Sequence, residues 1–119
     1  MQDAGLAALA EGDAASAAMR EAYERRARVV VDALTATPAV RAPMPEAGMF
    51  VLADVRETGL DGPAFADRLL DEEAVSVLPV DPFGPSGRGH VRIGLAAPEE
   101  VLAEACRRID RLARRLGDG

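Results

Sequence analysis

The order of the hydrophobic periodicities along the chain is the feature that most constrains its fold. Residues 13–37 and 98–116 repeat apolar side chains every three or four positions, the spacing that lines one face of an α-helix. Between them lie short apolar runs at 48–55, 74–80 and 89–95, which are rich in strand-forming residues. Helical patterns that alternate with strand patterns predict an α/β protein, a two-layer sandwich with a small sheet. The 119 residues suffice for one domain with one core.

Glycine and proline mark the expected ends of the first helices. We expect a short helix over residues 1–12 that ends near Gly12, then a longer one from Asp13 to Thr37 that Pro38 stops. The apolar stripe of the longer helix comprises Met19, Tyr23, Ala27, Val30 and Leu34.

Two further helices are predicted in the second half of the chain. One should start at Asp61, whose carboxylate can cap it, with Pro63 in its first turn, and should run to about Glu73. The residues expected on its buried side are Phe65, Leu69 and Leu70. The last helix should end at Gly117. Its apolar stripe is Leu102, Ala105, Ile109, Leu112 and Leu116.

Charge and composition argue against several classes of function. The net charge is −6, and the one basic cluster alternates with acids in the last helix, so no nucleic-acid partner is expected. No stretch approaches the length of a membrane span and no signal peptide is recognisable, so we expect a cytoplasmic protein without a membrane partner. Apart from His90, all 14 basic residues are arginines. Without a lysine, the chain by itself cannot form a lysine Schiff base.

Arg92 is the strongest candidate for a binding residue. It lies in the run GHVRIGL at 89–95, where the apolar side chains should face the helices and Arg92 should face the other way, with His90 and Gly94. A guanidinium there can hold a carboxylate through two parallel hydrogen bonds, and Gly94 would leave room beside it. The same pattern also fits an exposed arginine on an open sheet face.

Other reactive residues have simpler interpretations. His90 lacks a recognisable paired acid and is expected to be structural or solvated. Ser86 is a turn residue, because no nucleophile elbow surrounds it, and Phe83 anchors its loop. The single cysteine, Cys106, should be a small buried side chain. The acids at 71–73 mark a helix end, and no metal ligands are expected.

Three segments follow one another in a specific order. They are MREAYERRARVVVDAL, PEAGMFVLADV and FADRLLDEEAVSVLPVDPFGPSGRGHVRIGLA, and together they cover essentially the whole chain. The chain resembles the C-terminal part of class I/II, fold type I pyridoxal-phosphate aminotransferases, the group related to aspartate aminotransferase. The first segment resembles the interdomain helix of that family, and the last resembles its block of glycine-rich loop and arginine strand. The sequence departs from the usual pattern at Ala27, Ala47 and Val80.

The resemblance implies a fold and a role. The fold would be the small domain of these enzymes, a short and mostly antiparallel sheet with helices packed on one face. Residues 1–37 would be the interdomain helical segment, and residues 38–119 the substrate-closing domain. In that family the arginine of the last block binds the α-carboxylate of the substrate, and Arg92 matches it. The loop that supports the site would contain Phe83, Gly84, Ser86 and Gly87.

The resemblance also implies what this chain lacks. These enzymes transfer an amino group between an amino acid and a 2-oxo acid with pyridoxal phosphate, held by a large domain that carries the Schiff-base lysine, usually in a homodimer. Because the chain has no lysine, we expect no catalytic residue in it, no cofactor bound to it alone and no transamination by it alone. The alternatives are a stand-alone sensor of amino acids or 2-oxo acids and an assembly module derived from such a domain.

Overall fold

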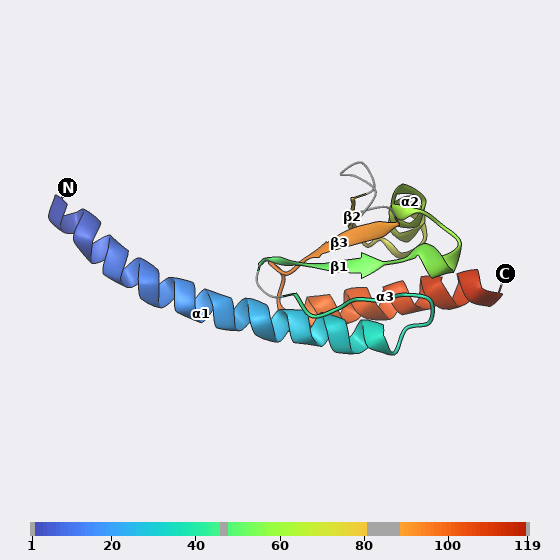
Figure 1. Cartoon of the computed structure of the whole chain (residues 1–119), viewed down its shortest axis with the longest axis horizontal. Coiled ribbons are helices and arrows are strands. Elements are labelled where there is room, and N and C mark those ends of the chain that lie inside the picture. The colour runs from blue at the N-terminus through green and yellow to red at the C-terminus, as the bar shows by residue number, and fades with distance from the viewer. Residues whose placement is uncertain (1, 46–47, 81–88, 119) are drawn as a thin grey trace.

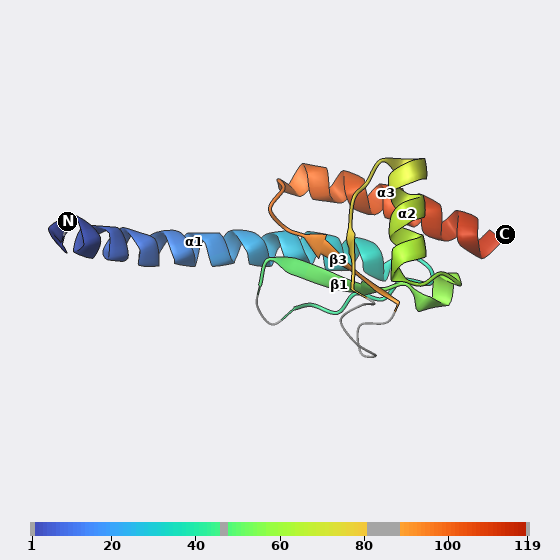
Figure 2. The same ribbon diagram turned by 90° about the horizontal axis from the view of Figure 1, so that it is seen from above.

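The computed structural model describes residues 2–45, 48–80 and 89–118 of the chain. In chain order its elements are α1 (Gln2–Thr35), β1 (Phe50–Asp54), the 3-10 turn η1 (Arg56–Thr58), α2 (Gly62–Glu73), β2 (Leu78–Pro79), β3 (His90–Gly94) and α3 (Glu99–Asp118). The three strands form one antiparallel sheet in the order β1-β3-β2. α1 and α3 lie side by side along one face of this sheet (Figures 1 and 2). The expected α/β fold with a small antiparallel sheet is therefore confirmed.

Alternation along the strands separates a core face from an open face. In β3, Val91 and Ile93 are buried against the helices, whereas Arg92 is half-buried on the opposite face. β1 alternates in register with β3, so Phe50 and Leu52 point away from the core and are exposed. The helices thus cover only one side of the sheet, as expected.

α1 is one continuous helix, so the expected break at Gly12 is wrong. A single glycine costs a helix interior only about 1 kcal/mol, and the residues around Gly12 are mainly alanine, the strongest helix former. The N-terminal half of α1 extends beyond the sheet (Figures 1 and 2). The molecule consequently measures 61 × 30 × 24 Å and has a radius of gyration of 16.7 Å, against about 13.5 Å for a compact domain of this length.

The apolar stripe of α1 is buried along only part of its length. Ala27, Val30 and Leu34 are buried in the core, and Tyr23 packs against its edge. Met19, on the same stripe, is 55% exposed. The stripe therefore continues past the end of the domain that covers it.

α2 begins as predicted but buries a different set of residues. The Asp61 carboxylate accepts a hydrogen bond of 2.9 Å from the Ala64 amide, which caps the helix. Phe65 and Leu69 are fully buried, but Leu70 is 54% exposed, so its expected burial is wrong. The buried stripe continues instead to Glu73, four residues after Leu69, because that spacing keeps a side chain on one helix face.

Two boundaries differ from expectation. The strand expected over 74–80 contains only Leu78 and Pro79, because the preceding residues serve to end α2. Ala74 adopts the left-handed conformation, and its amide donates to carbonyl groups of the last helical turn. α3 continues through Gly117 to Asp118 rather than ending at Gly117. Glycine at a helix end is permissive and does not by itself set the last residue.

A buried carboxylate joins α2 to α3. Glu73 is 8% exposed, and its two carboxylate oxygens lie 2.8 Å from guanidinium nitrogens of Arg111 and Arg115. Arg108 also donates a hydrogen bond of 2.9 Å to the Glu73 carbonyl. The hydrogen bond from Arg111 is the main cause that holds the pKa of Glu73 below its ordinary value, against the opposing effect of burial.

Replacing Glu73 with glutamine should make the domain less stable at neutral pH. Because the pKa of Glu73 is lower in the folded than in the unfolded chain, its contribution is complete above the ordinary value of 4.5 and is lost as the pH falls through the folded value. We expect Glu73→Gln to lower the free energy of unfolding by about 1 kcal/mol at pH 7. In acid the difference in this free energy between the variant and the wild type should become smaller. Urea unfolding at both pH values tests this. Glu72→Gln, in a more exposed pair, should lose less, and equal losses would contradict the prediction.

Candidate functional site

Arg92 stands at the centre of the open face of the sheet. It lies in the middle of the central strand β3, and its Cα pairs with that of Leu52 in β1 and that of Leu78 in β2. Leu52 and Leu78 are 41% and 44% exposed. A charged group is therefore held among apolar side chains, at a position that water reaches only in part.

Arg92 differs from the other arginines in what it contacts. Most arginines donate to a carboxylate or a carbonyl group: Arg26, Arg41, Arg56, Arg68, Arg107, Arg108, Arg111, Arg114 and Arg115. Arg20, Arg25 and Arg28 are exposed on α1. Within the described ranges, Arg92 is the half-buried arginine that has neither a hydrogen bond nor an ion pair. Its guanidinium lies over the ring of Phe50, 4.9 Å from the centroid.

The space next to Arg92 is open. A Cβ added at Gly94, two residues further along the same face, would meet no atom of the described residues within 4 Å. This is the room that the sequence leads us to expect beside the arginine. A planar guanidinium with free N–H donors and open space at its side can donate two parallel hydrogen bonds to an incoming carboxylate.

α1 is tied to the strand that carries Arg92. Nη1 of Arg26 donates a hydrogen bond of 3.0 Å to the carbonyl of Leu95, just past the end of β3. The same guanidinium lies 5.5 Å from the ring centroid of Tyr23. This contact couples the helix to the end of the arginine strand.

An acid stands opposite His90, which the sequence alone does not reveal. The antiparallel register pairs His90 with Asp54. Asp54, however, is held by Arg56, whose Nη2 lies 2.7 Å from Oδ2, and the hydrogen bond from Arg56 is the main cause that lowers the pKa of Asp54. The carboxylate of Asp54 is thus in an ion pair with Arg56. The pairing of His90 with Asp54 escaped prediction because it depends on strand register.

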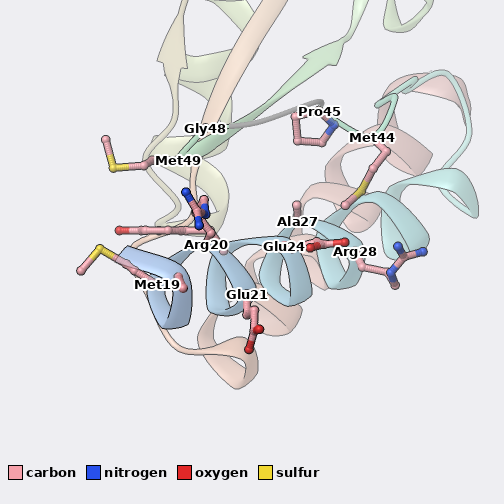
Figure 3. Close-up of a pocket in the computed structure, with 12 residues that line it drawn as sticks. Met19, Arg20, Glu21, Glu24, Ala27, Arg28, Met44, Pro45, Gly48 and Met49 are labelled. Carbon is pink, nitrogen blue, oxygen red and sulfur yellow. The ribbon is translucent and has the colours of Figure 1, made fainter. Parts of the chain in front are cut away.

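A groove lies elsewhere, between α1 and the segment before β1. It has a volume of about 630 Å³, and its walls include three exposed methionines, Met19, Met44 and Met49. Figure 3 shows Arg20 rising from α1 toward Gly48 and Met49. Charged side chains of α1, among them Arg20 and Glu24, line the groove together with the methionines. Arg92 does not line it, so the groove is separate from the surroundings of Arg92.

The remaining predicted residues fall into two groups. Phe83, Gly84, Ser86 and Gly87 lie outside the described residues. Cys106 is buried, as expected, and burial raises the pKa of its thiol to about 11, which makes it a poor nucleophile.

The described ranges contain neither a candidate metal site nor a candidate membrane span. No group of side chains there could hold a metal ion. None of the helices in those ranges is both long and apolar enough to cross a membrane.

The sequence matches the family model of the class I and II aminotransferases over residues 1–109. The chain belongs to this family. It is 51% identical over 109 residues to the arginine–pyruvate transaminase of Pseudomonas aeruginosa, an alignment that covers 92% of this chain and 28% of that enzyme. An aromatic aminotransferase from Pyrococcus horikoshii superimposes with a TM-score of 0.74 at 33% identity, over 81% of this chain and 26% of that one. This aminotransferase chain thus spans under a third of the length of these relatives.

The cofactor of the family is pyridoxal phosphate, and the covalent part of its site does not fit this chain. Cystalysin of Treponema denticola, which has a TM-score of 0.72 and 26% identity over 81% of this chain and 25% of its own, contains pyridoxal 5'-phosphate. All 14 residues of the Lys and Arg class here are arginines, so no side chain can form a Schiff base with an aldehyde. No step of the cofactor's chemistry is therefore assigned to residues of this chain.

Proposed function

We propose that this chain is the small, substrate-closing domain of a pyridoxal-phosphate-dependent aminotransferase, and that Arg92 binds the α-carboxylate of the amino acid and of the 2-oxo acid. In this proposal residues 1–37 form the interdomain segment, which contains α1, and residues 38–119 form the substrate-closing domain. One observation carries the proposal. Within the described residues, Arg92 is half-buried, shares its strand face with Gly94, beside which there is open space, and has no acid as a partner.

The contribution of this chain to catalysis is to hold and orient the substrate. Two parallel N–H···O bonds from Arg92 fix both the position and the rotation of a carboxylate. Leu52 and Leu78 keep water away from this pair, and partial exclusion of water strengthens its electrostatic attraction. A fixed carboxylate in turn fixes the direction of the neighbouring α-carbon bonds, which is an entropic advantage for any group that removes the α-proton.

The partner that we propose is a large, lysine-bearing, cofactor-binding domain, in an enzyme that is a homodimer. The exposed apolar residues of this chain support such a partner. Met19, Met44 and Met49 line the groove beside α1, and Phe50 and Leu52 follow directly on the open face of the sheet. Surfaces of this kind are uncommon on independent monomers and are typical of interfaces.

The isolated chain should show no transamination with added pyridoxal phosphate, because it has no lysine. Activity should appear when this chain replaces the matching region of the Pseudomonas aeruginosa relative, which supplies the rest of the enzyme. Conversion of arginine and pyruvate by the hybrid is the measurement. The relative truncated before the matching region is the control. Turnover by the pure isolated chain, or a folded and cofactor-loaded hybrid without turnover, would contradict the proposal.

The exposed apolar surface also supports the alternative of an assembly module. Size-exclusion chromatography of the isolated chain at several concentrations separates the two functions. A self-associating chain whose hybrid is inactive is an assembly module. Tight binding of a free amino acid without any cofactor would instead indicate a sensor, whereas the detached domain should bind it feebly.

A further inference from the structure

We propose that Phe50 is the positioning residue of Arg92, which keeps the guanidinium aligned for a carboxylate without occupying any of its hydrogen-bond donors. This inference rests on the proposed function, since it concerns how the same arginine is prepared for its ligand. The guanidinium of Arg92 lies over the Phe50 ring, 4.9 Å from the ring centroid.

Strand register places the ring beside the guanidinium. Phe50 pairs with Gly94, which is two residues from Arg92 on the same face. The amide of Leu95 donates to the Met49 carbonyl, so the neighbouring pair is the hydrogen-bonded one, and Phe50 with Gly94 forms the close, non-hydrogen-bonded kind. The diagonal neighbours of an antiparallel pair are within reach of an aromatic side chain, so the Phe50 ring can lie against Arg92, two residues from its partner Gly94.

The chemistry of the contact explains why an aromatic residue suits this task. The five N–H donors of a guanidinium lie in its plane, whereas a cation–π contact uses its charge. Arg56 illustrates the other way to fix an arginine: its Nε and Nη2 both donate to Asp54, and that carboxylate occupies the donors that a ligand would need. A ring holds the guanidinium and leaves its donors available.

The exposure of Phe50 fits this role. Phe50 is 38% exposed and lies on the sheet face that the helices do not cover, so its side chain is not part of the buried core. Among the described residues, Arg92 is in contact with this ring. We therefore expect its replacement to change the affinity of Arg92 for carboxylates more than the stability of the fold.

The test uses the isolated chain, with pyruvate as the carboxylate probe. The Nε–H signal of Arg92 is followed by 15N NMR while pyruvate is added, which measures even a weak dissociation constant. The variants are Phe50→Leu, which keeps apolar bulk but removes the ring, and Phe50→Tyr, which keeps the ring. Val101→Ala, at an exposed apolar position on α3, is the control for unspecific effects.

We expect Phe50→Leu to raise the dissociation constant about two- to tenfold and to abolish the ring-current shift of the Arg92 signal, whereas Phe50→Tyr and Val101→Ala leave both unchanged. Equal affinities for the wild type and Phe50→Leu would overturn this inference while leaving the role of Arg92 intact. If the Arg92 signal of the wild type does not respond to pyruvate, the proposed carboxylate site is wrong, and the inference falls with it.

Discussion

Replacing Arg92 with alanine in the hybrid enzyme should lower kcat/KM by about thirtyfold or more. Removing one partner of a charged, partly desolvated hydrogen-bonded pair costs about 2–5 kcal/mol, and each 1.4 kcal/mol is a factor of ten. The loss should be large because, within the described ranges, no other half-buried arginine lacks a partner. Steady-state kinetics with arginine and pyruvate measure the effect.

Two matched variants sharpen this result. Arg92→Lys keeps the charge but loses the planar pair of donors, so its kcat/KM should lie between those of the wild type and Arg92→Ala. Arg20→Ala removes an exposed arginine of α1 and should leave kcat/KM unchanged. A hybrid in which Arg92→Ala is no worse than Arg20→Ala would show that Arg92 does not bind the substrate.

Replacing Leu34 with alanine should lower the free energy of unfolding of the isolated chain by about 3 kcal/mol. Leu34 is fully buried at the C-terminal end of the α1 stripe, and Leu→Ala changes in cores leave cavities that cost about 2–5 kcal/mol. Such a loss is a large fraction of the roughly 5–15 kcal/mol by which domains of this size are stable. Urea unfolding followed by circular dichroism measures it.

Met19→Ala is the matched control on the same stripe. Because Met19 is 55% exposed, its truncation removes little buried surface, and the free energy of unfolding should change by less than about 0.5 kcal/mol. If Leu34→Ala and Met19→Ala lowered the free energy of unfolding equally, Met19 would be buried by some other contact in the isolated chain, which would contradict this prediction. The pair thus tests where the domain ends along α1.

The features that depend only on residues close together in the sequence could be predicted. Asp61 caps α2 as expected, because a cap needs only an acceptor and an amide three residues later. β3 faces Val91 and Ile93 inward and Arg92 outward, because strand alternation is a local property of the backbone. The family was predictable as well, since the order of three segments is a property of the sequence.

The errors have one physical origin, the choice between local structures of similar free energy. Gly12 permits a helix end but does not require one, and the alanines around it favour continuation. Leu70 is apolar, yet the position of α2 against its neighbours buries Glu73 instead. The residues before Leu78 could form a strand, but they end α2.

The sequence by itself determined the α/β class, the family and the strand on which Arg92 lies. It also determined that no side chain here can form a Schiff base, because composition alone excludes it. Only the tertiary structure decided what surrounds Arg92. The ring of Phe50 and the open space at Gly94 depend on the register between β1 and β3, and that register follows from packing both strands on the helices.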